Sequence, residues 1–270
     1  MAIGNNSNVS LTDLSLISQD VYLDQCNLQN GWKRQAQSNL WYLDGFFAAL
    51  YVKGNDMVIA YRGTDPRDPL SWLVDALTDA QILTSQFPDA IAQSQRAISF
   101  AKEWMDQYEN YNFTFTGHSL GGYLAQYAAV HVEEDLGKTI PTVAYNAPGF
   151  YDSLVDKQLD CTNMLDIVVK GDGVGAVLPL LGTRIVVPQI VYEGFMPTHS
   201  MENFLLLFNE MHSSWAQDVL SSSVHPYGGD SDKLIVGNNY NDPKLQLQVE
   251  HFGKMAATSG CIKVVEKCIE

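Results

Sequence analysis

Apolar residues recur along the chain with two different periods, which distinguish helices from strands. Between Leu11 and Val21 they lie three or four positions apart, which predicts an amphipathic helix near the start of the chain. The runs 46–52 and 57–61 are apolar, β-branched or aromatic, and the polar, glycine-containing segment 53–56 separates them. This second pattern predicts a β-hairpin after the first helix.

Strands and helices alternate further along the chain. Pro88 begins a long predicted helix that extends to Tyr108. Three apolar runs are predicted strands: 113–116, 142–145 and 164–170. A sharp turn at 117–121 and a helix over 123–132 follow the first of them. This alternation predicts an α/β fold with a mainly parallel central sheet and helices on both faces, whose ligands bind at the carboxyl ends of the strands.

The length and the net charge of the chain limit the domain organisations and the partners that we expect. The chain has 270 residues, 46% of them hydrophobic, and no Pro/Gly/Ser-rich linker divides it. We expect one domain over residues 1–220, with residues 221–270 as a C-terminal extension packed on the same domain. The formal charge of −15 repels nucleic acid phosphates, so the expected partner is a small neutral or apolar molecule and not a nucleic acid.

No targeting or membrane-spanning pattern is recognisable in the sequence. Residues 1–8 are polar, and no run of eighteen apolar residues occurs, so we expect a cytoplasmic protein or one exported by a signal-less route. The cysteines have no metal-ligand spacing, and free, buried thiols are expected, with a Cys261–Cys268 pair as the alternative. The four are Cys26, Cys161, Cys261 and Cys268.

The strongest chemical signal is Gly117-His118-Ser119-Leu120-Gly121, a Gly-x-Ser-x-Gly sequence between a predicted strand and a predicted helix. A serine nucleophile needs its hydroxyl held clear of the sheet on a tight, strained turn, and small flanking residues allow the backbone to form it. The N–H that follows the serine then points at the developing oxyanion, with the helix dipole behind it. The motif predicts Ser119 as a nucleophile and the Leu120 N–H as an oxyanion donor.

A nucleophilic serine needs a base, and the base needs an acid that orients it. In α/β-hydrolases the chain order is serine, then acid, then histidine. His199, in the loop 196–199 before an amphipathic pattern at 201–219, is the first choice for the base, and His225 is the second. The other histidines considered are expected to be structural or solvated: His131, His212 and His251.

Asp172 is the predicted acid. It follows the strand 164–170 and lies between two glycines, where a carboxylate can turn back over the strand ends. Four other acids are expected to cap helices or to contact solvent: Asp152, Asp156, Asp160 and Asp166. Thr64, at the end of the strand 57–61, is predicted to supply the second oxyanion donor through its N–H and its hydroxyl.

Together these residues resemble a known family, the class 3 lipases, including their bacterial lipase-like branch. The matching segments occur in the family's order between Gly45 and Asp172. They are Val58-Ile59-Ala60-Tyr61-Arg62-Gly63-Thr64, Trp72 with Asp75, Gly117-His118-Ser119-Leu120-Gly121-Gly122, and Asn146-Ala147-Pro148-Gly149.

The resemblance implies an α/β-hydrolase fold and ester hydrolysis through an acyl-enzyme, with no metal or organic cofactor. It matches Ser119 to the family's nucleophile, Asp172 to its acid, and Thr64 and Leu120 to its oxyanion hole. The family's lid, a short amphipathic helix over the site, matches residues 66–77.

We therefore expect a serine carboxylic-ester hydrolase, a lipase or esterase that acts on acyl glycerides or related lipid esters and touches a lipid interface transiently. A phospholipase, thioesterase or acyltransferase with the same three residues is an alternative, as is a noncatalytic binding protein on this scaffold. Several apolar residues either bind an acyl chain or belong to the core: Leu70, Leu73, Val74, Leu77, Val177, Leu178, Leu180, Leu181 and Phe195.

Overall fold

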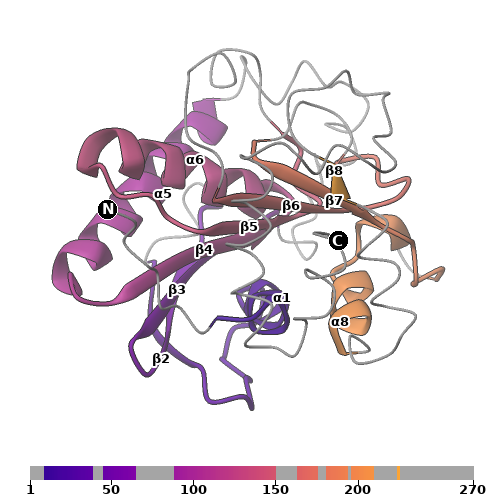
Figure 1. Cartoon of the computed structure of the whole chain (residues 1–270), viewed down its shortest axis with the longest axis horizontal. Helices are drawn as coiled ribbons and strands as arrows, with labels where there is room; N and C mark the ends of the chain where they lie inside the picture. Colours follow the sequence, from indigo (N-terminus) through magenta and orange to yellow (C-terminus); the bar gives the residue numbers. More distant parts are fainter. Residues whose placement is uncertain are drawn as a thin grey trace, which may run out of the picture.

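One mixed sheet of eight strands organises the chain, whose computed structural model describes residues 9–38, 45–64, 88–149, 163–175, 181–193, 196–209 and 224–225. The strands lie side by side in sequence order (Figure 1). They are β1 (Lys33–Gln37), β2 (Ala48–Lys53), β3 (Asp56–Tyr61), β4 (Asn112–His118), β5 (Thr142–Tyr145), β6 (Met164–Val169), β7 (Thr183–Val187) and β8 (Val224–His225). β3 to β7 are parallel, whereas β1, β2 and β8 pair antiparallel with their neighbours. The parallel strands therefore end at one common edge.

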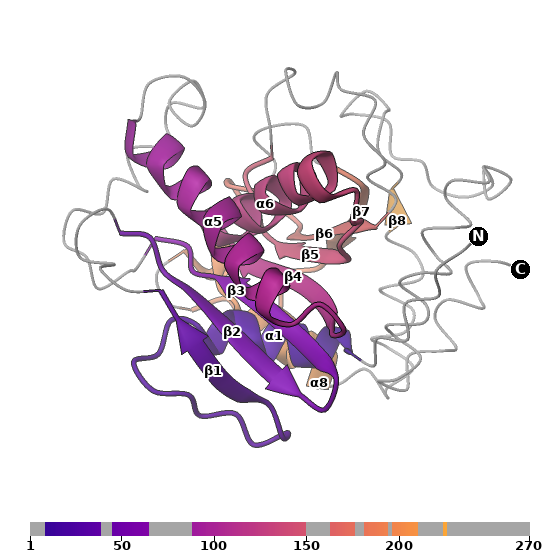
Figure 2. The same ribbon diagram turned by 90° about the vertical axis from the view of Figure 1, so that its left-hand side faces the viewer.

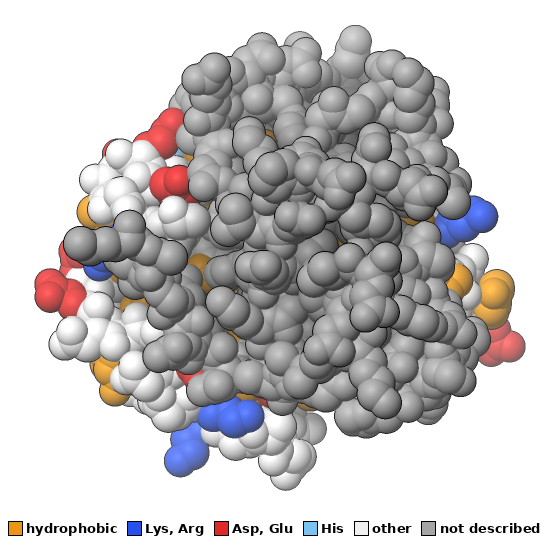
Figure 3. All heavy atoms as spheres, viewed as in Figure 1, with side chains coloured by type: hydrophobic (Ala, Val, Ile, Leu, Met, Phe, Trp, Pro, Cys, Tyr) orange, Lys and Arg blue, Asp and Glu red, His pale blue; other side chains and the backbone are white. Residues whose placement is uncertain are grey.

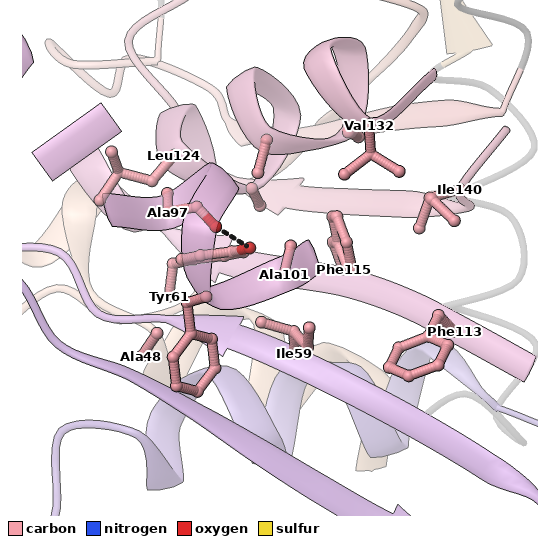
Figure 4. Close-up of a cluster of buried hydrophobic side chains, with 14 of the residues drawn as sticks. Ala48, Ile59, Tyr61, Ala97, Ala101, Phe113, Phe115, Leu124, Val132 and Ile140 are labelled. Atoms are coloured by element: carbon pink, nitrogen blue, oxygen red, sulfur yellow. Dashed lines mark hydrogen bonds between the residues drawn. The ribbon is translucent and has the colours of Figure 1, made fainter. Parts of the chain in front are cut away.

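Helices cover both faces of this sheet (Figure 2). The helices α5 (Pro88–Gln107) and α6 (Leu120–Leu136) lie on one face, and α1 (Leu11–Asp20) and α8 (Glu202–Asn209) lie on the other. Alternate residues of a strand point to opposite faces, so Ala48 and Leu50 of β2 join the core under α5 and α6, while Ala49 and Tyr51 join the core under α1 and α8. Figure 4 shows the first of these cores, in which the Tyr61 hydroxyl donates to the Ala97 carbonyl oxygen of α5.

The predicted elements that the structure describes are confirmed with small shifts of their ends. The first helix is α1, the hairpin is β2–β3, the long helix is α5, and the three predicted strands are β4, β5 and β6. The helix after the nucleophile starts at Leu120, inside the predicted turn, and runs to Leu136. Residues 66–77 and 210–219 lie outside the described part of the chain.

Three strands are not predicted from the pattern. β1 has the sequence Lys-Arg-Gln-Ala-Gln, whose residues alternate between exposed and half-buried. It is an edge strand, and its residues are too polar for an apolar pattern to predict it. β7 lies in a glycine-interrupted apolar stretch, and β8 has only two residues. Pairing with the neighbouring strand, and not local periodicity, makes these segments extended.

Figure 3 shows both acidic and basic groups around the margin of one face. Cys26 is a free thiol, as expected, but it is exposed and not buried, because it lies in the loop after α1. In the described ranges, no helix is both long and apolar enough to cross a membrane.

A buried ion pair holds the end of α1 against the sheet. The Arg34 guanidinium lies 2.8 Å from the Asp20 carboxylate, and both side chains are at most 6% exposed. The Tyr51 hydroxyl and the Asn27 N–H also donate to Asp20, each at 2.8 Å. Burial, together with the Asp20 charge, raises the pKa of Tyr51, so this hydroxyl stays a donor. The Asp20 carboxylate is thus buried and accepts hydrogen bonds from a guanidinium, a phenol and a backbone N–H.

Replacing Arg34 with methionine is expected to lower the free energy of unfolding by about 3 kcal/mol, because the Asp20 charge stays buried without its counter-ion. Urea unfolding at pH 7 measures this change. The double variant Arg34→Met/Asp20→Asn should recover part of the loss. Lys102→Met, which breaks an ion pair with the exposed Asp135, is the matched control and should leave the urea midpoint nearly unchanged. Equal losses in the two methionine variants would contradict the prediction.

Asp166 of β6 corrects an expectation, because it neither caps a helix nor contacts solvent. Its side chain is fully buried and accepts a hydrogen bond from Gln126 Nε2 of α6 at 2.6 Å. Burial raises its pKa to about 8, against the smaller opposing effects of the Gln126 hydrogen bond and of the Arg184 charge. The error arises because Asp166 is the one acid in the predicted strand 164–170, and a strand buried on both faces leaves it no route to water.

Candidate active site

The turn around Ser119 has the strained geometry that a serine nucleophile requires. Ser119 follows β4 directly and adopts φ 58° and ψ −131°, a conformation unusual for a residue with a side chain. The flanking glycines are sterically necessary. A Cβ on Gly117 would lie 2.3 Å from the Gly121 carbonyl group, and a Cβ on Gly121 would lie 2.1 Å from the Tyr61 carbonyl oxygen. The motif therefore brings the start of α6 against the ends of both β3 and β4.

Asp172 and His199 lie in contact, although 27 positions separate them. His199 Nδ1 is 3.0 Å from Asp172 Oδ1 and 3.2 Å from Oδ2. The carboxylate also accepts the Gly175 N–H at 2.7 Å, and it is 2% exposed. Since the acceptor Asp172 faces Nδ1, the proton of a neutral His199 lies on Nδ1 and leaves Nε2 as a base.

Two asparagines hold the loop that carries His199. This residue ends the short 3-10 helix η1 (Pro197–His199), which follows Met196 at a positive φ of 49°. Asn146, after β5, donates to the Thr198 carbonyl oxygen at 3.1 Å and accepts the Val169 N–H at 2.8 Å. It therefore ties the histidine loop to the end of β6.

Asn203 of α8 supports the same loop from the other side. It donates to the carbonyl oxygens of Pro197 and Ser200, and its side-chain oxygen accepts the N–H groups of Ile190 and Val191. Sequence reasoning did not assign a role to either asparagine. Asn146 belongs to a segment matched to the class 3 lipases, but its hydrogen bonds span β5, β6 and η1 and depend on the tertiary structure.

Three polar atoms at this site are buried and have no hydrogen-bond partner: Ser119 Oγ, His199 Nε2 and Thr64 Oγ1. Ser119 Oγ and His199 Nε2 are thus not bonded to each other in this conformation; in serine hydrolases without substrate this contact is often long. His199 lies beside the nucleophile turn, because its ring centroid is 4.6 Å from that of His118. Buried polar atoms are costly when unpaired, and their concentration at one place is typical of a site built for a ligand.

The segment Gly63–Thr64 lies beside the nucleophile. A Cβ on Gly63 would be 3.2 Å from Ser119 Cβ and 2.6 Å from the His118 carbonyl oxygen. Leu120 is the first residue of α6, and the first N–H groups of a helix have no acceptor within the helix. The two predicted oxyanion donors thus come from the segments that flank Ser119, one after β3 and one after β4.

Two further residues of the site, Tyr22 and His118, were also missed by sequence reasoning. His118 is buried, and burial and the neighbouring His199 hold its pKa well below the usual value. Its Nε2 is 2.7 Å from the His199 carbonyl oxygen, and its Nδ1 is 3.2 Å from the Tyr22 hydroxyl. His118 could have been found from its position next to the predicted nucleophile. Tyr22 lies 96 positions from His118, and no local pattern pointed to it.

The remaining candidates divide into those found elsewhere and those not described. His131 lies on α6 and bonds to the Tyr127 carbonyl oxygen, which confirms its structural role. Leu181 is buried in the core under α5 and α6 and does not line the site. His225 is in β8, and the histidine that contacts Asp172 is His199. The following lie outside the described residues: Asp152, Asp156, Asp160, His212, His251, Leu70, Leu73, Val74, Leu77, Val177, Leu178, Leu180 and Phe195. Among the described residues, no group of three or more His, Cys, Asp or Glu side chains could hold a metal ion.

The sheet order and the strand–serine–helix turn define an α/β-hydrolase fold, and solved structures share it. A mutant form of MDLA from Penicillium cyclopium has a TM-score of 0.55 and 14% identity, over 92% of this chain and 96% of that one. A lipase from Rhizopus microsporus var. chinensis has a TM-score of 0.53 and 15% identity, over 72% and 84% of the two chains. The Rhizomucor miehei lipase in its propeptide complex has a TM-score of 0.52 and 15% identity, over 66% and 67%.

The chain belongs to the Mbeg1-like family, whose sequence profile matches residues 27–189. No curated protein matches the sequence. The structural neighbours described here come from fungi, so they give no support to the bacterial branch of the lipase resemblance. The lipase-like fold itself is confirmed.

Proposed function

We propose that this protein is a serine carboxylic-ester hydrolase in which Ser119 is the nucleophile, His199 the general base and Asp172 the acid that orients it. The observation that carries the proposal is the pairing of Asp172 with His199 Nδ1, next to a strained serine turn with an unpartnered Oγ. In the neutral imidazole, this pairing places the proton on Nδ1 and the lone pair on Nε2, where a base would act. The proposed oxyanion hole consists of Thr64 and the Leu120 N–H.

In the proposed reaction, His199 Nε2 takes the Ser119 proton while Oγ attacks the ester carbonyl carbon. The oxyanion of the tetrahedral intermediate accepts hydrogen bonds from Thr64 and from the Leu120 N–H, and the helix dipole of α6 adds to this stabilisation. The alcohol leaves with the proton from His199. Water then attacks the acyl-enzyme, His199 takes a proton from that water, and Ser119 recovers its proton as the acid is released. No step requires a metal or an organic cofactor.

Acyl esters of lipids are the proposed substrates. One structural neighbour is described as the Rhizomucor miehei triacylglyceride lipase, and another as the Lip2 lipase of Yarrowia lipolytica. Their likeness to this chain is at the level of fold, so the substrate is inferred by analogy. The net charge of −15 agrees with a neutral ester, because such a substrate avoids the repulsion that a polyanion would meet.

The test combines labelling with turnover. The protein is treated with a fluorophosphonate, the labelled peptide is identified by mass spectrometry, and hydrolysis of p-nitrophenyl esters of increasing acyl length is measured with and without detergent. We expect the label on Ser119 and faster hydrolysis of the longer acyl chains. Hydrolysis confined to the shortest esters would favour an esterase. Absence of both labelling and turnover, also in detergent, would overturn the proposal and favour a binding protein on this scaffold.

A further inference from the structure

Tyr22 connects three segments of the candidate site that are far apart in the sequence. Its hydroxyl accepts the Gly63 N–H at 3.0 Å and lies 3.2 Å from His118 Nδ1. On the other side of the same ring, His118 Nε2 is 2.7 Å from the His199 carbonyl oxygen. The oxyanion segment, the residue before the nucleophile and the histidine loop are therefore linked through one phenol and one imidazole.

The direction of this hydrogen-bonded chain follows from its ends. A carbonyl oxygen only accepts, so the proton of His118 must lie on Nε2 and point at His199. In the neutral ring Nδ1 is then an acceptor, and the Tyr22 O–H donates to it. An amide N–H only donates, so Gly63 donates to Tyr22 Oη. The chain runs in one direction, from the Gly63 N–H through Tyr22 and His118 to the His199 carbonyl oxygen. The Tyr22 hydroxyl also has a longer contact, 3.5 Å, with the His118 carbonyl oxygen.

Hydrogen bonds of neighbouring residues anchor the backbone at Tyr22, so this residue can hold other segments in place. It comes two residues after Asp20, whose carboxylate and carbonyl oxygen are both bonded to Arg34. In α1 itself, Ser18 Oγ lies 2.9 Å from Thr116 Oγ1 of β4, and Thr116 in turn donates to the Val143 carbonyl oxygen at 2.8 Å. The end of α1 is thus anchored to the strand that carries the nucleophile.

We propose that Tyr22 is a positioning residue that holds the oxyanion segment Gly63–Thr64 at a fixed place relative to Ser119 and His199. This inference rests on the proposed function, because it assigns Tyr22 a role in that reaction. Oxyanion donors act only when they lie at hydrogen-bond distance from the oxyanion, and a displacement of about 1 Å costs roughly a hundredfold in rate. Tyr22 acts through the Gly63 backbone and the His118 ring, the two groups to which its hydroxyl is hydrogen-bonded.

The variant Tyr22→Phe keeps the ring and removes the hydroxyl, so Gly63 loses its acceptor and His118 Nδ1 loses its donor. We expect kcat to fall by about 10- to 100-fold with KM changed by less than about threefold, because the defect concerns the transition state and not substrate binding. The matched control is Tyr145→Phe. The Tyr145 hydroxyl is also buried and also tethers α1, through the Leu11 carbonyl oxygen at 3.2 Å, but its side chain bonds to none of the three segments.

A second readout does not depend on turnover. In the wild-type protein, two-bond ¹H–¹⁵N correlation spectra should show His118 as the neutral tautomer protonated at Nε2. Amide hydrogen exchange of Gly63 should accelerate by about tenfold or more in Tyr22→Phe and stay unchanged in Tyr145→Phe. His118 protonated at Nδ1, or unchanged exchange of Gly63 in Tyr22→Phe, would show that the chain does not hold the segment.

The outcomes separate this inference from the proposed function. A wild-type protein that hydrolyses esters, with Tyr22→Phe equally active, would overturn the role of Tyr22 alone. Equal losses of kcat in Tyr22→Phe and Tyr145→Phe would also overturn it, since general loosening of α1 would then explain both. A wild-type protein without labelling and turnover would overturn the proposed function, and with it the catalytic role of Tyr22.

Discussion

Replacement of Ser119 with alanine is expected to lower kcat for ester hydrolysis by about a millionfold without lowering the stability of the fold. The loss follows from the role of Ser119 Oγ as nucleophile. The stability should stay equal or rise by up to about 1 kcal/mol, because this buried Oγ has no hydrogen-bond partner to lose. Alanine has a Cβ like serine, so the strain at φ 58° stays the same. Steady-state kinetics and urea unfolding measure the two effects.

Ser18→Ala provides the opposite control. Ser18 is also fully buried, but its Oγ is bonded to Thr116 Oγ1 at 2.9 Å and lies in α1. This variant should lose stability, by about 1 kcal/mol, and keep its kcat. If Ser119→Ala retained a substantial fraction of the wild-type kcat, Ser119 would not be the nucleophile. If it lost stability as Ser18→Ala does, Ser119 Oγ would have a structural role that its surroundings do not explain.

The second prediction concerns Asp166 and pH. Because burial raises the pKa of this carboxyl to about 8 from its ordinary 3.8, the folded protein holds a proton between these values that the unfolded chain releases. The free energy of unfolding should therefore fall as the pH rises from about 4 to about 8, and this contribution should level off above. Over the whole interval it amounts to roughly 5 kcal/mol.

Asp166→Asn should remove this dependence. An asparagine oxygen can still accept from Gln126 Nε2, and the amide carries no charge to bury. We expect equal stabilities of variant and wild type near pH 4 and a more stable variant at pH 8, measured by urea unfolding at closely spaced pH values. A variant less stable at pH 8 would mean that Asp166 is ionised and paired in the folded protein.

The control for this series is Asp135→Asn, which has the opposite sign. The Lys102 ammonium bonded to Asp135 lowers the pKa of this exposed carboxyl, so its contribution is present above its usual pKa and is lost as the pH falls. Above pH 5 the stability curve of this variant should run parallel to that of the wild type. The stability of Asp166→Asn should differ increasingly from that of the wild type as the pH rises above 5.

Most of the central sheet could be predicted from the sequence, because its strands are apolar runs bounded by turn residues. The run 142–145 is β5 to the residue, and β4 and β6 differ from their predictions by one or two residues at an end. β1 could not be predicted in the same way, because its polar residues form a strand only through pairing with β2. Burial of Asp166 was missed for a related reason: it depends on tertiary neighbours such as Gln126 of α6, which the local sequence pattern does not contain.

Some parts of the candidate site could be predicted from the sequence, and others could not. The strand–serine–helix motif predicts a tight turn, because a side chain at Gly117 or Gly121 would collide with neighbouring backbone atoms. His199 was chosen from its loop position alone. Its contact with Asp172 depends on Asn146 and Asn203, whose side chains make six hydrogen bonds to this loop and to the segments around it. Contacts between residues so far apart in the sequence produce no periodic pattern that could predict them.

By itself, the sequence determined the α/β class, the strand–turn–helix around Ser119 and the set of acids and histidines from which a site could be built. These properties depend on the spacing and the size of residues that are close to one another in the sequence. Only the tertiary structure decided that Asp172 pairs with His199, that Asp166 is buried, and that Tyr22 joins Gly63 to His118. Each of these facts depends on residues that are 27 to 96 positions apart in the sequence and that meet only once the strands have assembled into the sheet.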